Sequence, residues 1–127
     1  MTLYILDTTF LVDHLRGDRD THDRMARLVE LGDEPFVTDV IVAEAWSGAH
    51  DDDDPDLEAL LRFIEFVQPG PIQAKRAGRF RAEARRRGWT LSTADALIAA
   101  SAESLDATIL TRNLRDFALT PISVETY

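Results

Sequence analysis

The sequence has no cysteine, only one lysine and no long apolar run. Without cysteine the chain has no disulfide framework, no thiolate nucleophile and no cysteine-ligated zinc site, which is typical of proteins in a reducing compartment. No apolar run approaches the roughly 20 residues that span a bilayer. The first residues also lack the basic segment and apolar stretch of a signal peptide. We therefore expect a cytoplasmic protein without a membrane segment.

Basic residues are scarce overall, with 14 Lys and Arg against 23 Asp and Glu and a net charge of −9. This balance alone disfavours a nucleic-acid partner, because affinity for nucleic acid comes mainly from neutralising phosphates. The distribution is uneven, however. Residues 75–87 hold seven basic residues against one acidic residue, a net charge of +6 that leaves −15 for the rest. This segment is either a solvated helix face or a surface for a polyanion or an acidic partner.

Short apolar runs alternate with helical patterns along the 127 residues, of which 45% are hydrophobic. This length and composition suit one domain. We expect strands at residues 3–6, 35–37, 107–111 and 122–124, with 67–68 a weaker candidate. We expect helices at residues 8–17, 20–31, 40–49, 55–66, 72–87 and 94–104, and a turn or short helix at 113–117. The alternation predicts an α/β fold, a three-layer α/β/α sandwich around a central, mostly parallel sheet.

Three acidic residues stand alone in apolar surroundings. Asp7 directly follows the apolar run 3–6, Glu44 lies within the apolar segment 40–46, and Asp95 lies within 93–100. A buried carboxylate costs several kcal/mol unless it is paired or holds a metal. In an open α/β sheet, ligands bind at the carboxyl ends of the strands. One shared cation is therefore the most economical explanation for all three acids.

Each of these acids also has a purely structural explanation. Asp7 could cap the first helix, Asp95 could favour the dipole of its own helix, and Glu44 could pair with a buried arginine such as Arg112. These three explanations would have to hold together, and we therefore prefer the metal site.

The remaining polar clusters are simpler to interpret. The acidic residues 51–54 and Asp56 are expected to form a solvated loop, with Asp54 as the N-cap and Pro55 at the first helical position. The histidines lie in polar and separate sequence contexts, which predicts no histidine-rich ligand set; they are His14, His22 and His50.

Four segments, in order and spread over the whole chain, resemble the motifs of PIN domains, and specifically of VapC-type toxin nucleases. They are residues 5–13, 37–48, 93–102 and 110–117. Carried over by position, the resemblance makes Asp7, Glu44 and Asp95 acids of the site and Thr8 the hydroxyl residue after the first acid. The last motif departs from the family pattern, because Asn113 stands where many relatives have Asp. Asp116 follows three residues later, so either residue could complete the site.

The resemblance implies a single PIN domain over residues 1–127 and a metal-dependent endoribonuclease, the toxin of a toxin–antitoxin pair. It would hydrolyse RNA phosphodiesters through a metal-activated water at the acidic cluster. An all-oxygen ligand set suits Mg²⁺, with Mn²⁺ as a substitute. Asp7 and Asp95 would bind the metal most directly, and Glu44 would act through water. Asn113 or Asp116 would complete the ligands, with Asp116 also a candidate catalytic acid.

The resemblance also implies an RNA substrate, a cognate antitoxin and a homodimer. Thr8, Arg112 and Arg115 are candidates for contacting the substrate. Large apolar residues could serve a dimer or antitoxin surface, although core packing is their commoner fate; they are Trp46, Phe63, Phe66 and Trp89. The alternative function is a PIN-like RNA-binding or protein-interaction module without turnover, for which Asn113 in place of an acid is the argument.

Overall fold

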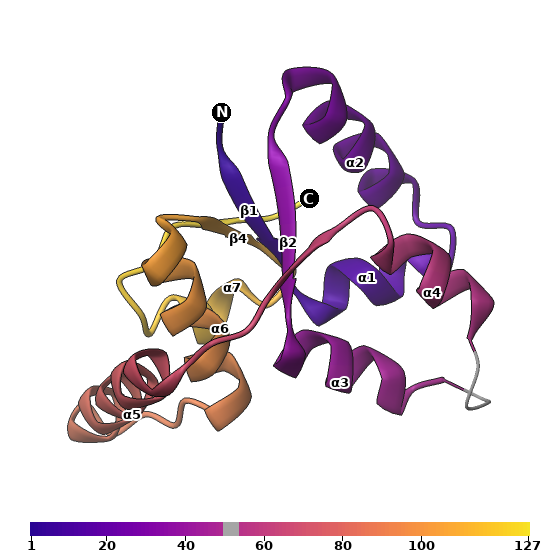
Figure 1. Cartoon of the computed structure of the whole chain (residues 1–127). Coiled ribbons are helices and arrows are strands. Elements are labelled where there is room, and N and C mark those ends of the chain that lie inside the picture. The colour runs from indigo at the N-terminus through magenta and orange to yellow at the C-terminus, as the bar shows by residue number, and fades with distance from the viewer. Residues whose placement is uncertain (50–53) are drawn as a thin grey trace.

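The computed structural model describes residues 1–49 and 54–127, which form a parallel sheet with helices on both faces (Figure 1). The five strands are ordered β3-β2-β1-β4-β5. They are β1 (Leu3–Leu6), β2 (Glu34–Thr38), β3 (Glu65–Val67), β4 (Thr108–Leu110) and β5 (Val124–Glu125). Because all four pairings are parallel, the carboxyl ends of the strands meet at one edge. The predicted α/β/α sandwich is confirmed.

Within the described residues, seven helices connect these strands. They are α1 (Thr8–Leu15), α2 (Arg19–Leu31), α3 (Asp39–Ser47), α4 (Pro55–Leu61), α5 (Pro71–Arg86), α6 (Thr93–Leu105) and α7 (Leu114–Phe117). Figure 1 shows α1 to α4 on one side of the sheet and α5 to α7 on the other. Right-handed crossovers require this division, because the chain steps outward from β1 to β3 and then crosses back to β4.

Polar side chains cap the starts of four of the described helices, α2, α3, α4 and α6. The Thr38 hydroxyl accepts a hydrogen bond from the Ile41 amide at the start of α3. The Asp54 carboxylate accepts one from the Leu57 amide at 3.1 Å, and Pro55 is the first residue of α4, as predicted. Each bond satisfies an amide that the helix itself cannot pair. The rest of the acidic run, residues 51–53, lies outside the described residues.

The helix predicted over residues 55–66 is too long. It ends at Leu61, and residues 65–67 instead form the edge strand β3, in which Phe66 pairs with Val37 of β2. A short apolar run fits the period of a helix and of a strand equally well, so the pattern did not separate the two. Phe63 lies in the turn between them and is 84% exposed.

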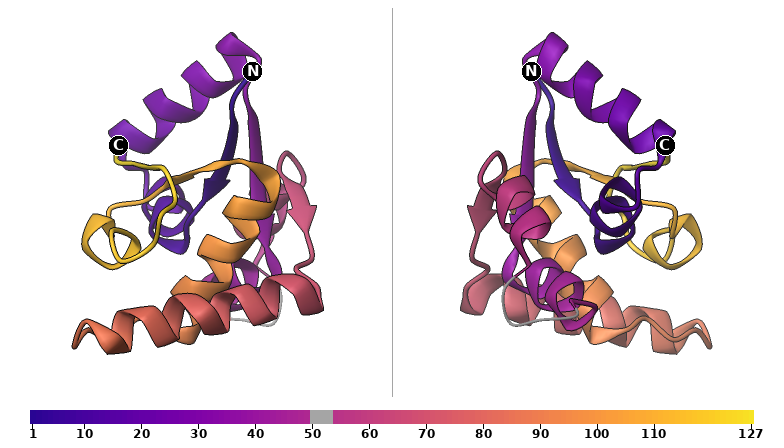
Figure 2. Two further views of the ribbon diagram at one scale, coloured as in Figure 1. Left: turned by 90° about the vertical axis from the view of Figure 1, so that its left-hand side faces the viewer. Right: turned by 90° about the vertical axis from the view of Figure 1, so that its right-hand side faces the viewer.

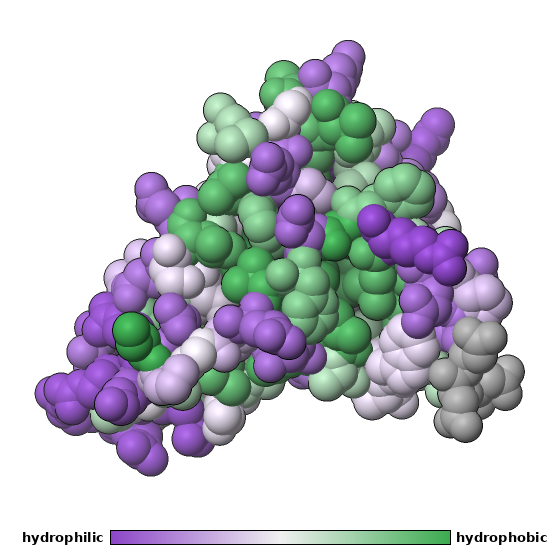
Figure 3. Space-filling view, in the orientation of Figure 1, coloured by the Kyte–Doolittle hydropathy of each residue, from purple (hydrophilic) through white to green (hydrophobic). Residues whose placement is uncertain are grey.

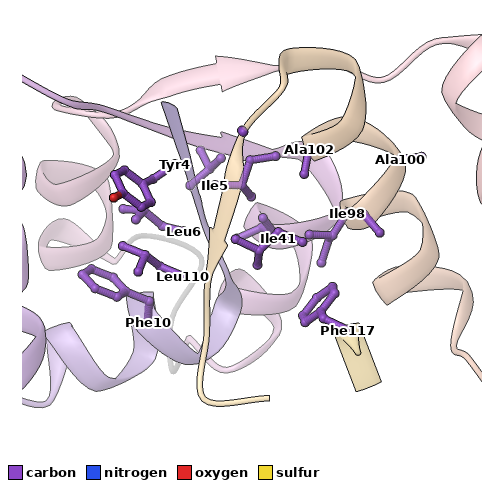
Figure 4. Packing of buried hydrophobic residues seen from close by; sticks show 14 of the residues in the cluster. Tyr4, Ile5, Leu6, Phe10, Ile41, Ile98, Ala100, Ala102, Leu110 and Phe117 are labelled. Atoms are coloured by element: carbon purple, nitrogen blue, oxygen red, sulfur yellow. The ribbon is translucent and has the colours of Figure 1, made fainter. Parts of the chain in front are cut away.

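The hydrophobic core fills both faces of the sheet. Ile5 of β1 and Ile109 of β4 are fully buried at its centre. Figure 4 shows Phe10 of α1 on one side of the sheet, and Ile98 of α6 and Phe117 of α7 on the other. The central strands are thus covered on both faces, as parallel sheets generally are.

Helix α5 lies across the end of the molecule where the strands finish, as both views of Figure 2 show. It packs against α6 through the buried side chains of Ala77, Phe80 and Ala84. Its basic residues are mostly exposed, and the surface over it is hydrophilic in Figure 3. In the described part of the chain, no helix combines the length and apolar character that crossing a bilayer requires.

Candidate active site

Asp7 sits at the carboxyl end of β1, the central strand of the sheet. Its amide donates to the carbonyl of Leu110 in β4 at 3.0 Å, and the residue is only 4% exposed. The Thr111 hydroxyl donates to Asp7 Oδ2 at 2.6 Å, and the Thr9 hydroxyl lies 3.5 Å from the same oxygen. Asp7 occupies the N-cap position of α1, but its side chain makes no capping hydrogen bond there, so capping does not account for the carboxylate.

Burial is the main influence on the charge of Asp7. It raises the pKa of this carboxyl, because a dry environment disfavours the ionised form. The hydrogen bond from Thr111 opposes this shift, and the negative charge of Glu44 reinforces it. Hydrogen bonds from the Thr111 hydroxyl, the Thr8 amide and the Thr9 hydroxyl therefore oppose the effect of burial on Asp7.

Asp95 is the third residue of α6 and faces the same edge of the sheet. Its backbone amide donates to the Ser92 hydroxyl, which caps the helix, at 3.1 Å. Burial raises the pKa of Asp95 to about 6, with further upward contributions from the charges of Asp7, Asp116 and Glu44. Four acids from four parts of the chain therefore influence one another here. Asp95 also stands in the first turn of α6, where the helix dipole favours a carboxylate.

Glu44 lies on α3, across from α1. The Thr8 hydroxyl donates to Glu44 Oε1 at 2.9 Å and so joins the two helices. Arg112, the predicted structural partner of Glu44, instead pairs with Asp13 at 3.0 Å and Asp18 at 3.1 Å. The explanation of Glu44 as a partner of Arg112 is therefore wrong, and Glu44 remains an exposed carboxylate oriented by a hydroxyl.

The two candidates for the fourth position lie side by side. Asn113 Nδ2 donates to Asp116 Oδ2 at 3.1 Å, and the Asn113 amide donates to the Thr111 hydroxyl at 2.8 Å. Because the charge of Asp116 raises the pKa of Asp95, Asp116 is close enough to act on the cluster. Asn113 thus orients Asp116, and Thr111 links both residues to Asp7.

Sequence reasoning assigned no role in this site to the hydroxyls of Thr111 and Thr9. Thr111 follows β4 just as Asp7 follows β1, and the last residues of these neighbouring strands, Leu6 and Leu110, are paired in register. A polar residue directly after a buried strand was the available signal. Its importance depended on β4 being the neighbour of β1, which the sequence pattern does not reveal.

The donor set of the cluster suits a divalent cation with oxygen ligands. Asp7 and Asp95 both have raised pKa values, and in residues 1–49 and 54–127 no Arg, Lys or His forms an ion pair with any of the four acids. A bound cation would relieve their repulsion. Over the same residues, no three acidic or histidine side chains are already grouped closely enough to hold a metal. Side chains would have to move towards a bound ion.

Two of the histidines that lie in separate sequence contexts are neighbours in the structure. The rings of His14 and His22 are stacked with centroids 3.8 Å apart. Gly17, with a φ of 83°, turns the chain sharply between α1 and α2 and brings these residues together. His50 lies outside the described residues.

The cap that positions Asp95 can be tested by replacing Ser92 with Ala. We expect the free energy of unfolding to fall by about 1 kcal/mol, because the Asp95 amide loses its acceptor. Urea titration would measure the change. Thr93→Ala, at the exposed next position, is the matched control. Equal stability of the two variants would show that the cap contributes nothing.

Comparison with known proteins gives consistent matches. A family model described as PIN domain matches residues 4–121. Ribonuclease VapC19 of Mycobacterium tuberculosis is 31% identical over 117 residues, covering 92% of this chain and 94% of that protein. A chain of VapBC2 from Rickettsia felis, bound to a promoter DNA fragment, superposes with a TM-score of 0.88 at 20% identity over 99% of both chains. A chain of DNA-bound VapBC from Salmonella typhimurium gives 0.84 at 22% identity over 99% and 98%.

Proposed function

Because this chain belongs to the PIN domain family, and within it to the VapC-type ribonucleases, we propose that it is a metal-dependent endoribonuclease and the toxin of a toxin–antitoxin pair. We further propose that residues 1–127 act as a single PIN domain. The observation that carries this proposal is the gathering of four acids at one edge of the sheet, where burial and the charges of Asp7, Asp116 and Glu44 raise the pKa of Asp95 to about 6.

We assign Asp7 and Asp95 as direct ligands of Mg²⁺, or of Mn²⁺ in its place, with Asp116 or Asn113 completing the set. When bound, the cation would lower the pKa of a water and offset charge on the phosphate in the transition state. The protein supplies orientation. The Thr111 hydroxyl donates to Oδ2 of Asp7 and so fixes the orientation of this carboxylate.

The exposed Glu44 would orient the attacking water, because its second oxygen is not bound by Thr8. Two of the predicted substrate contacts are already engaged. The Thr8 hydroxyl donates a hydrogen bond to Glu44, and Arg112 forms ion pairs with Asp13 and Asp18. Arg115 is exposed on α7, one residue from Asp116, and is the stronger candidate for contacting a phosphate.

We also propose the partners that the relatives suggest. The similar solved structures are of VapBC pairs. By analogy, an antitoxin would bind this chain and block the acidic cluster. The chain itself would form a homodimer, and toxin and antitoxin would both act in the cytoplasm.

The proposed function is tested with purified protein, freed of antitoxin and of metal, incubated with total cellular RNA. Addition of Mg²⁺ or Mn²⁺ should yield discrete fragments, and Asp7→Asn should abolish them. Asp23→Asn, an exposed acid on α2, is the control and should cleave like the unchanged protein. RNA binding without cleavage under either metal would reject the nuclease and support the non-catalytic module.

A further inference from the structure

A groove adjoins the acidic cluster on the side of α7. Its walls are the connection between α5 and α6, at residues 88–90, and the segment from Arg115 to Leu119. Its volume of about 610 Å³ lies within the range of small-molecule sites. Asp116 belongs to both the groove and the acidic cluster, so the groove opens beside the proposed point of cleavage.

Trp89 is the principal aromatic surface of this groove and is 55% exposed. Its backbone is fixed by the way α5 ends. Gly88, with a φ of 78°, donates to the Arg85 carbonyl at 2.9 Å, and the Trp89 amide donates to the Ala84 carbonyl at 2.9 Å. These two bonds form a Schellman motif, in which the residue at the position of Trp89 commonly packs back on the helix. Here much of the indole instead faces solvent.

The far end of the same connection is also held. Arg81 Nε donates to the Leu91 carbonyl at 3.0 Å, and Leu91 itself is 2% exposed. The segment carrying Trp89 is therefore anchored on both sides. Because this backbone is already ordered, binding of a flat ligand to the Trp89 side chain needs little further ordering of the chain.

Arginines precede this aromatic residue in the chain and line the opposite wall of the groove. The three residues before Gly88 are arginines, and all three are exposed, as is Arg115 on the opposite wall. The acidic cluster would repel an RNA strand, so cations beside it are needed to bring the phosphates close. Exposed aromatic rings within a basic track are the means by which proteins hold single-stranded nucleic acid.

We propose that the groove between Trp89 and Arg115 binds a nucleotide next to the scissile phosphate of single-stranded RNA, with the base stacked on the Trp89 indole and its phosphate against Arg115. This inference rests on the proposed function for its placement at the cleavage point. In this arrangement Trp89 positions the substrate, and the RNA strand runs along the basic end of α5.

The test measures binding without cleavage. In the presence of chelator, the dissociation constant for fluorescent oligouridylate is compared with that for an abasic oligomer, which keeps the phosphates but has no bases. Trp89→Ala should weaken oligouridylate binding about tenfold or more and leave abasic binding unchanged. Trp89→Phe should retain most of the affinity. Arg115→Ala should weaken both probes, and Phe63→Ala, the exposed aromatic in the turn before β3, should weaken neither.

The outcomes separate this inference from the proposed function. If Mg²⁺ supports no cleavage but Trp89→Ala still weakens binding selectively, the proposed nuclease activity is wrong and the proposed nucleotide site is supported. If cleavage occurs but Trp89→Ala matches the unchanged protein in affinity and in KM, the proposed nucleotide site is wrong and the proposed nuclease activity is supported. Loss of self-association or of antitoxin binding in Trp89→Ala, with RNA affinity intact, would assign the groove to a protein partner and overturn the inference.

Discussion

Replacing Asp95 by Asn is expected to lower the rate of RNA cleavage by about a hundredfold to a thousandfold and, in the metal-free protein, to increase stability. The loss of activity is the size expected when one placed electrostatic group at a reacting centre is removed. The gain in stability follows from the position of Asp95. Its charge is partly buried and faces the charges of Asp7, Asp116 and Glu44.

The pH dependence of this gain is set by the pKa of Asp95, which is about 6 in the folded protein against an ordinary value of 3.8. As pH rises, the unfolded chain releases this proton first. Asp95 therefore destabilises the fold progressively between about pH 4 and pH 6, and fully above that. Allowing for the solvent that reaches a half-buried carboxylate, Asp95→Asn should be roughly 1 to 2 kcal/mol more stable at pH 7.5.

Urea titration in chelator, at pH 4 and at pH 7.5, measures this difference. The advantage of Asp95→Asn should shrink at the lower pH, and Asp23→Asn should show no such trend. Addition of Mg²⁺ should stabilise the unchanged protein more than Asp95→Asn, because a ligand stabilises the state that binds it. A variant that is less stable than the unchanged protein at pH 7.5 would refute the repulsion among these acids.

The sequence allowed the strand-then-acid arrangement to be predicted because each part of it is local. A buried strand such as Leu3–Leu6 is a continuous apolar run, and the acid that ends it stands out against that run. Asp95 and Glu44 were identified in the same way. The order of the motifs then indicated the family of the chain. That the three acids lie close together depends on contacts between residues far apart in the chain.

What could not be predicted depends on which strands are neighbours. The hydroxyl of Thr111 reaches Asp7 across 104 positions because β4 pairs with β1, and no periodicity encodes that pairing. The boundary between α4 and β3 was predicted wrongly for a related reason. Pairing of Phe66 with Val37 of β2, rather than local preference, makes that run a strand.

Replacing Thr111 by Val should uncouple Asp7 from its main hydrogen-bond donor while nearly preserving the shape of the side chain. The hydroxyl donates to Asp7 at 2.6 Å, accepts from the Asn113 amide at 2.8 Å, and is fully buried. Its loss leaves the buried Asp7 carboxylate and the half-buried Asn113 amide without this partner, so the free energy of unfolding should fall by about 1 to 3 kcal/mol. Urea titration of the metal-free variant would show the fall.

The same substitution should change the pH dependence of RNA cleavage. Because the Thr111 hydroxyl lowers the pKa of Asp7, its removal raises that pKa further and keeps Asp7 protonated over more of the acidic range. A protonated Asp7 binds a divalent cation poorly. The acidic limb of the pH profile should therefore move to higher pH, and the rate should fall more at acidic pH than at neutral pH.

Two control variants separate this electrostatic effect from simple loss of structure. Thr111→Ser keeps the hydroxyl and should keep the pH profile, although it loses a buried methyl group. Thr108→Val makes the same chemical change in β4, three residues before Thr111 and outside the acidic cluster. It should leave the pH profile unchanged. If Thr111→Val lowered the rate equally at every pH, Thr111 would only support the fold. A shift of the profile in Thr111→Val alone would mean that this hydroxyl keeps Asp7 ionised for the metal.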